Sequence, residues 1–248
     1  MSRAEFLLPL AGLIFIFSAA TALPAAEPSD FGEAIVAAPD RNAEDLRLDE
    51  RRHPAQLLDF SGVKPGMKVL DMMAGGGYTT ELLARAVGGS GRVYAQSRPG
   101  GPEKSHQALV ERMARPAMTN VVLAETPLEA PVPDGSHDFD LVTLILNYHD
   151  ITYLPVDRAK MNRAMFDCLK PGGALVIVDH AANPGAGTTV GKSLHRIEES
   201  ALIAEVEAAG FKKAAEADFL RQPGDPRDQP FFNMDSPTDQ FVLKFVKP

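Results

Sequence analysis

The chain has 248 residues, 45% of them hydrophobic and 23% charged, which is typical of one globular domain with a full core. Its formal net charge is −8, and Lys212 and Lys213 form the only pair of adjacent lysines. Nucleic-acid binding requires a basic surface, so this charge balance argues against a nucleic-acid substrate and favours a small-molecule substrate.

The N-terminus has the pattern of an export signal. Arg3 precedes an apolar run over residues 6–20, and small residues follow at Ala20 and Ala22. This pattern predicts a cleaved signal peptide over residues 1–22 and an exported, periplasmic protein with no membrane span after cleavage. An uncleaved membrane anchor is the alternative, because the apolar run approaches spanning length.

The remaining chain divides into a short linker and one domain. Residues 23–40 are rich in proline and alanine and are expected to be irregular, and residues 41–248 are expected to form the domain. Cys168 is the sole cysteine, so an intrachain disulfide is excluded and we expect this thiol to pack inside a helix.

A strand–loop–helix unit over residues 69–80 is the most informative segment. A short apolar run ends at Asp71, three glycines follow from Gly75 to Gly77, and a helical pattern begins. Glycines allow close backbone approach to a ligand. The third small residue of a dinucleotide fingerprint is missing, and an acid four residues before Gly75 suits a ligand with positive charge and donors, such as S-adenosylmethionine. A plain glycine-rich turn is the alternative.

Helical and strand patterns alternate along the chain. A helix over 41–60 is expected to break near His53. Further helices are predicted at 103–114, 156–169 and 194–209, and strands from Met67 and at 91–96, 120–124, 139–146, 174–179, 211–219 and 240–246. This order predicts an α/β fold with a doubly wound, mostly parallel, seven-stranded Rossmann-like sheet whose last strand is antiparallel. The connection 220–239 carries four prolines and is a candidate lid.

In such a sheet, ligands bind at the carboxyl ends of the strands. His149 and His180 each follow a buried strand there, and either is a candidate general base that Asp150 or Asp179 would orient. Hydrogen-bonded caps of the strand ends are the alternative. A metal site formed by His149, Asp150, His180 and His195 is a weaker alternative, because no close ligand pair supports it, and no metal site is predicted. His53, His106 and His137 are expected to be structural or solvated.

The order of segments resembles the class I S-adenosylmethionine-dependent methyltransferases. The matching stretches are Val69–Gly77, Phe139–Val142 and Leu169–Asp179. Residues 49–54, 63–69, 195–198 and 239–245 are similar, more narrowly, to a branch of predicted exported bacterial methyltransferases. The resemblance implies the fold and S-adenosylmethionine as cofactor.

The resemblance also implies roles for individual residues. The loop after the first strand would wrap the methionine part of the cofactor, with Asp71 orienting its amino group; these residues are Asp71, Ala74, Gly75 and Gly77. Gln96 and Ser97 stand where the family has a ribose-binding acid, and Met73 replaces the first glycine of the loop motif. Glu125 and Thr126 fall near the adenine, although Glu125 is equally a solvated loop acid. Asn147 would contact the methionine moiety or the acceptor.

The expected function is therefore methyl transfer from S-adenosylmethionine to a small-molecule acceptor. A non-catalytic metabolite-binding module on the same fold is the alternative, and a nicotinamide-dependent oxidoreductase is a weaker one. The sequence sets neither the acceptor nor the oligomeric state.

Overall fold

The computed structural model describes Met1 and residues 30–248. The predicted signal peptide, apart from Met1, and residues 23–29 of the predicted linker lie outside the described residues. Within the described part, none of the helices is both long and apolar enough to cross a membrane.

Seven strands form one sheet in the order β3-β2-β1-β4-β5-β7-β6. β1 to β5 run parallel, and β7 lies antiparallel between β5 and β6. The predicted fold class is confirmed, including the antiparallel last strand. The strands are β1 (Lys68–Met72), β2 (Arg92–Ser97), β3 (Val121–Glu125), β4 (Phe139–Ile145), β5 (Leu169–His180), β6 (Lys212–Ala217) and β7 (Gln240–Val246).

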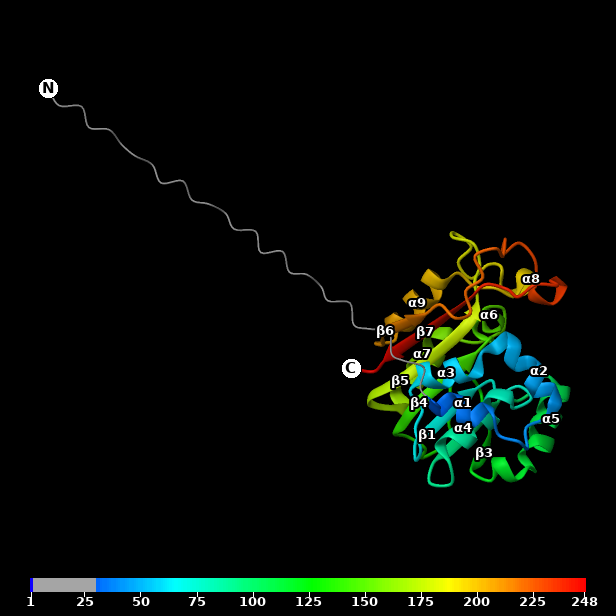
Figure 1. The fold of residues 1–248 in the computed structure, drawn as a ribbon. Helices are drawn as coiled ribbons and strands as arrows, with labels where there is room; N and C mark the ends of the chain where they lie inside the picture. The colour runs from blue at the N-terminus through cyan, green and yellow to red at the C-terminus, as the bar shows by residue number, and fades with distance from the viewer. Residues whose placement is uncertain (2–29) are drawn as a thin grey trace.

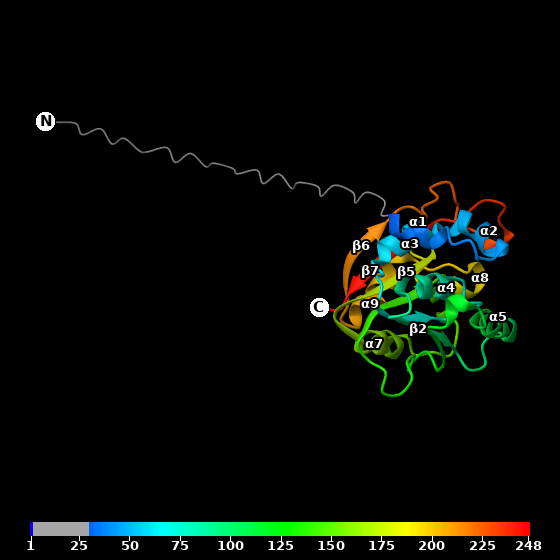
Figure 2. The same cartoon turned by 60° about the horizontal axis from the view of Figure 1, so that its bottom comes forward.

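Helices cover both faces of the sheet (Figures 1 and 2). One face packs against α1 (Asp30–Val36), α3 (Pro54–Ser61) and α4 (Tyr78–Val87), and the other against α7 (Arg158–Cys168) and α9 (Glu199–Ala208). The remaining helices are α2 (Ala43–Arg52), α5 (Glu103–Met113), η1 (Pro116–Met118), α6 (Tyr148–Ile151), α8 (Gly191–Leu194) and η2 (Phe231–Asn233).

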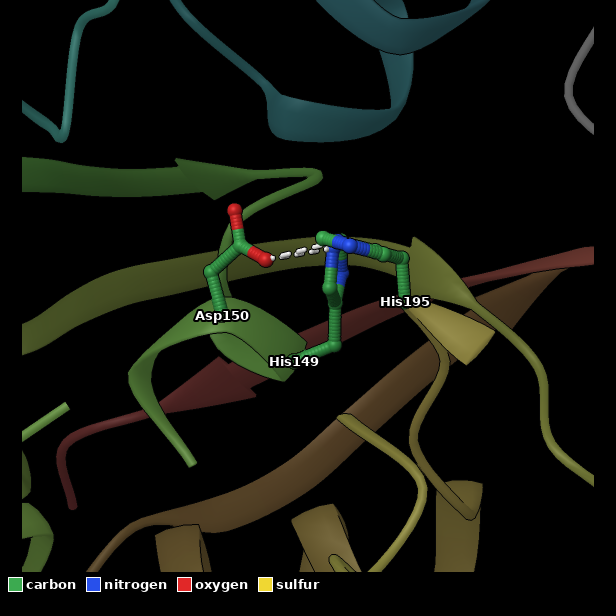
Figure 3. A group of neighbouring side chains, drawn as sticks. All are labelled: His149, Asp150 and His195. Carbon is green, nitrogen blue, oxygen red and sulfur yellow. Dashed lines mark hydrogen bonds and ion pairs between the residues drawn. The ribbon is translucent and has the colours of Figure 1, made fainter. Parts of the chain in front are cut away.

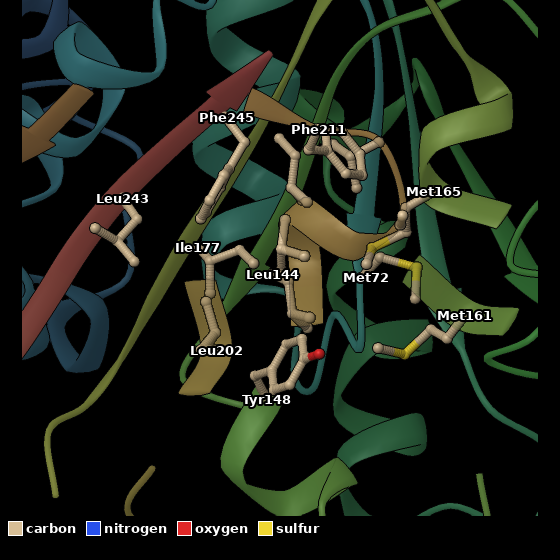
Figure 4. Packing of buried hydrophobic residues seen from close by; sticks show 14 of the residues in the cluster. Met72, Leu144, Tyr148, Met161, Met165, Ile177, Leu202, Phe211, Leu243 and Phe245 are labelled. Carbon is tan, nitrogen blue, oxygen red and sulfur yellow. The ribbon is translucent and has the colours of Figure 1, made fainter. Parts of the chain in front are cut away.

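The parallel strands are apolar on both faces because each face carries helices. Leu144 and Ile177 point to the face covered by α7 and α9, where they pack with Met161 and Leu202 (Figure 4). Val176, the residue before Ile177 in β5, points to the other face and packs in the core under α3 and α4. Alternation along each strand thus builds two cores from one sheet and leaves the carboxyl ends of the strands uncovered for a site.

Three predicted elements differ from the structure. Residues 30–36, expected to be irregular, form α1, whose Phe31, Ile35 and Val36 join the core under α3 and α4. β5 begins at Leu169 instead of in the 174–179 segment, because Leu169 pairs with Phe139 across an irregularity in the register. The helix predicted over 194–209 begins only at Glu199, as α9, because His195 adopts a left-handed φ of 51° and ends the preceding short helix α8.

The break near His53 occurs as predicted, with a left-handed φ of 44° between α2 and α3. The connection 220–239 contains η2 and joins β6 to β7. In Figure 1 it lies near α8, at the end of the sheet where the parallel strands finish. The candidate lid therefore lies at the edge where a ligand site was predicted.

Candidate functional site

Asp71 lies one residue before the end of β1, in a buried position. Its side chain accepts hydrogen bonds from the hydroxyls of Thr80 (2.6 Å) and Thr143 (2.7 Å), and the residue is 2% exposed. Burial raises the pKa of Asp71 to about 6, although the two hydroxyls oppose that shift. A positively charged ligand group beside it would favour the ionised carboxylate.

The loop after β1 depends on residues in the left-handed region. Gly75 and Gly77 have φ of 57° and 81°. A Cβ on Gly77 would lie 2.8 Å from Leu109 Cδ1, whereas one on Gly75 would meet nothing nearer than 3.9 Å. Met73, which replaces a glycine of the family motif, has a φ of 49°, a conformation that strains a non-glycine residue. The loop is therefore tight at Gly77 and open at Gly75.

Gln96 lines the β2 side of the site and also supports the loop after β1. Its Oε1 accepts a hydrogen bond from Met73 N (3.0 Å), and its Nε2 donates one to the carbonyl of Thr126 (2.6 Å). Each polar atom of the buried amide has one backbone partner, so Gln96 braces the loop against the end of β3, and its predicted contact with a ribose hydroxyl stays a prediction.

Three cavities follow one another along this edge of the sheet. The loop cavity, about 360 Å³, lies between α2 and the loop after β1. The β2 cavity, about 250 Å³, shares Met73, Gly75 and Asn147 with it. The lid cavity, about 270 Å³, lies under the 220–239 connection and shares Leu48, Arg52 and Leu146 with the loop cavity. The shared walls make the three cavities neighbouring parts of one trough.

The predicted loop residues Asp71, Ala74 and Gly75 line the loop cavity, whereas Gly77 shapes the turn behind it. Ser97 lines the β2 cavity, and its hydroxyl lies 3.3 Å from Nδ1 of His106, which also lines this cavity. His106 was expected to be structural or solvated, so its place in the wall is a finding of the structure.

Glu125 and Thr126 do not line the β2 cavity. The Glu125 carboxylate is exposed and lies 3.8 Å from His106 Nε2, and the Thr126 hydroxyl donates to the carbonyl of Pro131. Both residues lie outside the described wall of this cavity, and their contact with the adenine stays a prediction. Asn147 does line the trough, where its Nδ2 donates to the carbonyls of Ile145 (2.7 Å) and Met73 (3.3 Å).

Arg52 is a site residue to which the sequence assigned no role. It lines both the loop cavity and the lid cavity, and its guanidinium lies 4.9 Å from the centre of the Tyr78 ring. Among the described residues it makes no hydrogen bond or ion pair, and burial lowers its pKa. An unpaired guanidinium in a cavity wall suits a ligand carboxylate. In the sequence, only the similarity of residues 49–54 to other methyltransferases pointed to this arginine.

His149 is held between two carboxylates. Its Nδ1 lies 2.5 Å from Asp179 Oδ1, its Nε2 lies 3.1 Å from Asp150 Oδ1, and its backbone N–H donates to Asp179 Oδ2. Burial alone would lower the pKa of His149, but the carboxylates of Asp179 and Asp150 raise it to about 10. A group that keeps its proton at neutral pH does not suit the predicted role of general base.

His180 occupies a different environment. Its Nδ1 lies 2.7 Å from the Thr238 hydroxyl, and its ring stacks on Phe231 with the centroids 4.7 Å apart. Burial lowers the pKa of His180 to about 4, so the imidazole is neutral at neutral pH. His180 lines the lid cavity.

His195, which follows the short helix α8, completes a cluster with His149 and Asp150 (Figure 3). Its Nδ1 lies 3.0 Å from Asp150 Oδ1, and its ring meets Phe232 at a centroid distance of 5.3 Å. Asp150 itself lies in α6, the short helix after β4 that sequence patterns missed, and it lines the β2 cavity. Its pKa is lowered to about 2, because contact with His149 outweighs the effect of burial.

The chain is similar to the ubiquinone/menaquinone biosynthesis C-methyltransferase UbiE of Cronobacter sakazakii, with 33% identity over 123 residues, which are 49% of this chain and 46% of that protein. The chain therefore spans about half the length of the curated relatives it matches.

Solved structures show the same fold. A SAM-dependent methyltransferase from Aquifex aeolicus superposes with a TM-score of 0.59 at 18% identity, covering 90% of this chain and 99% of that one. The cyclase SpnF superposes with a TM-score of 0.58 at 16% identity, covering 79% and 82%. The family model for ubiE/COQ5 methyltransferases matches residues 49–186, which contain α3, β1 to β5 and the trough residues from Arg52 to His180. By this match the chain belongs to the ubiE/COQ5 methyltransferase family, whose members depend on S-adenosylmethionine.

Proposed function

We propose that this protein transfers a methyl group from S-adenosylmethionine to a small-molecule acceptor bound in the lid cavity. The observation that carries the proposal is the continuous trough, with a buried carboxylate and an unpaired guanidinium in its central part. Asp71 and Arg52 both line the loop cavity, and the β2 and lid cavities extend it on either side.

The residues of the trough fit the cofactor. Its methionine end carries an ammonium and a carboxylate, which match Asp71 and Arg52 in charge. The open backbone at Gly75 allows close approach, and the Ser97 hydroxyl in the β2 cavity is available to a ribose hydroxyl. When bound, the cofactor supplies a methyl group on a positively charged sulfur.

The lid cavity suits a compact acceptor with a flat face. Leu48, Leu146, Leu220 and Phe231 give it apolar walls, and the stacked rings of His180 and Phe231 form a planar surface. Curated relatives are named as C-methyltransferases of ubiquinone/menaquinone biosynthesis, and we extend from them only transfer to a small planar acceptor.

The protein contributes positioning more than proton transfer. Methyl transfer requires the acceptor atom and the methyl group to be aligned. Arg52 and Leu146 line both the loop cavity and the lid cavity, so the cofactor and the acceptor would meet beside these two residues. His180, as a neutral imidazole bonded to Thr238, can hold a hydrogen bond to the acceptor. His149 keeps its proton and orients its neighbours.

A non-catalytic binding module is the second candidate. The observation in its favour is that an amide, Gln96, stands where the family has a carboxylate and bonds Met73 N and Thr126 O, so the usual charge-assisted contact to ribose is missing. This candidate predicts cofactor-sized ligands that bind without turnover.

Export belongs to the proposal as well. The pattern of residues 1–22 and the resemblance to exported methyltransferases support secretion, after which the mature chain starts near Leu23. Fractionation of cells that express the full chain, with mass analysis of its N-terminus, tests this part. An intact N-terminus on a cytoplasmic protein would contradict it.

Calorimetry with S-adenosylhomocysteine and S-adenosylmethionine tests the cofactor. We expect binding by the wild type, a loss of about tenfold or more in Asp71→Asn and Arg52→Gln, and no change in Arg163→Gln, which alters an exposed ion pair. Absence of binding by the wild type would overturn the proposal. Binding without methyl transfer to any of a panel of phenols and quinols would favour the binding module.

A further inference from the structure

Three potential ligand atoms converge from two segments of the chain. His149 Nε2 and His195 Nδ1 lie 3.1 Å and 3.0 Å from Asp150 Oδ1, and the three atoms all fall within 4.8 Å of one another (Figure 3). In a tetrahedral site with bonds of about 2.0–2.1 Å, neighbouring donor atoms are about 3.3 Å apart. The observed spacing matches one ion shared by the three side chains.

Hydrogen bonds alone account poorly for this arrangement. Besides the two imidazoles, Asp150 Oδ1 accepts a hydrogen bond from the Tyr153 hydroxyl at 2.7 Å. A carboxylate oxygen has about two lone-pair sites, so three groups compete for them. An ion at the centre would take one lone pair of the oxygen and one of each imidazole, and would leave the other lone pair to Tyr153.

A buried carboxylate already prepares His149 as a ligand. Asp179 can only accept hydrogen bonds when ionised, so its contact with Nδ1 holds a proton on that nitrogen and directs Nε2 toward Asp150 and His195. Binding of an ion at Nε2 would release the proton that this nitrogen shares with Asp150. Asp179 is itself fixed by the backbone N–H groups of His149 and His180. A carboxylate that orients a ligating histidine in this way is a common feature of protein metal sites.

We propose that His149, Asp150 and His195 bind a divalent transition-metal ion of the zinc class through Nε2, Oδ1 and Nδ1. Two imidazoles and one carboxylate favour zinc, cobalt or iron(II) over magnesium and calcium, which prefer oxygen ligands. Three protein ligands leave a coordination position open, as in sites that also bind water or a small molecule.

The position of the cluster gives the ion an entry path. The side chains of Asp150 and His195 are 30% and 25% exposed, whereas that of His149 is 2% exposed and forms the floor. Asp150 and Tyr153 line the β2 cavity, and His195 contacts Phe232 on the side of the lid. The site stands between the two outer parts of the trough, and its occupancy by metal does not depend on methyl transfer.

Metal titration of the full chain, stripped with a chelator, tests the site. We expect one equivalent of Zn²⁺ by calorimetry and a visible absorption band from bound Co²⁺, with no competition by Mg²⁺ or Ca²⁺. His195→Ala and Asp150→Asn, both at partly exposed positions, should weaken Zn²⁺ binding by at least about tenfold and abolish the Co²⁺ band. Asp179→Asn should weaken it by about 10–100-fold.

His137→Ala is the matched control, because His137 also lies 2.6 Å from an adjacent aspartate, Asp138, but on the surface and without a second imidazole. It should bind as the wild type does. The proposal is overturned if the stripped wild type binds no Zn²⁺ or Co²⁺, or if it binds them no more tightly than His195→Ala does. Circular dichroism of each stripped variant separates lost ligation from lost folding.

Discussion

Thr143 donates its hydroxyl hydrogen to the Asp71 carboxylate over 2.7 Å, and the two residues are register partners in the parallel strands β4 and β1. With Thr80 on the other oxygen, the carboxylate is held inside the sheet where water cannot solvate its charge. The group that prepares the loop for a cationic ligand therefore lowers the stability of the ligand-free protein at neutral pH.

This cost depends on pH. The pKa of Asp71 is raised from 3.8 to about 6 by burial, so between these values the folded state binds more protons than the unfolded state. The free energy of unfolding consequently falls as pH rises from about 4 to about 6, by an amount on the order of 3 kcal/mol from this residue. Asp71→Asn removes that contribution. We therefore expect the free energy of unfolding of Asp71→Asn, relative to that of the wild type, to increase from about pH 4 to about pH 7.5, as measured by urea unfolding.

Asp167→Asn, in an exposed ion pair, is the control and should show no comparable change with pH. If the free energies of unfolding of Asp71→Asn and the wild type differed by the same amount at about pH 4 and at about pH 7.5, the raised pKa of Asp71 would be contradicted. Added S-adenosylhomocysteine should then stabilise the wild type more than the variant.

Gly77→Ala should destabilise the protein by about 2 kcal/mol. The left-handed φ of 81° is unfavourable for alanine, and the new Cβ would lie 2.8 Å from Leu109 and 3.0 Å from Arg112. Gly76→Ala is the matched control, because its Cβ would meet only Ala108, at 3.5 Å. Thermal unfolding of both variants measures the difference, and equal melting temperatures would show that the turn at Gly77 is not constrained.

Arg196→Met should loosen the 220–239 connection. The side chain is fully buried, forms an ion pair with Asp225 at 2.8 Å, and donates to the carbonyls of Gln229 and Ala181. Loss of one partner leaves a buried carboxylate without its cation, at a cost of about 3–5 kcal/mol. Limited proteolysis should show earlier cleavage within 220–239 than in the wild type. Simultaneous replacement with Asp225→Leu should recover part of the resistance, whereas unchanged cleavage would contradict an anchoring role.

Cys168 should be unreactive in the native protein. It is 5% exposed, and burial raises the pKa of its thiol to about 12, so almost no thiolate forms at neutral pH. A thiol reagent should label the native chain at a rate orders of magnitude below that of a free cysteine, and label one thiol per chain in denaturant. Rapid labelling of folded protein would contradict the packing of α7 against the sheet.

The sequence identified the parts of this protein that depend on local pattern. Apolar strands alternating with helical stretches predicted the doubly wound sheet, and Asp71 with the glycines predicted where the loop approaches a ligand. Gly75 indeed has a left-handed φ and an open face. These predictions succeeded because strand burial, turn conformation and loop geometry are set by neighbouring residues.

Local pattern was insufficient at His195. The apolar spacing of residues 194–209 predicts one continuous helix. In the structure, the left-handed His195 and the buried Arg196 interrupt that helix. Bonds from Arg196 to the 220–239 connection, about 30 residues further on, decide the path of the chain there. A helical pattern cannot reveal a tertiary contact of this kind.

The sequence by itself determined the fold, the loop after β1 and the edge of the sheet at which a ligand would bind. Only the tertiary structure decided that Gln96 is committed to Met73 and Thr126, that Arg52 stands unpaired in the trough, and that His195 meets Asp150. The physical reason is that a hydrogen bond or ligand set between segments 45 residues apart depends on strand register and loop path to within about an ångström, which spacing along the chain does not specify.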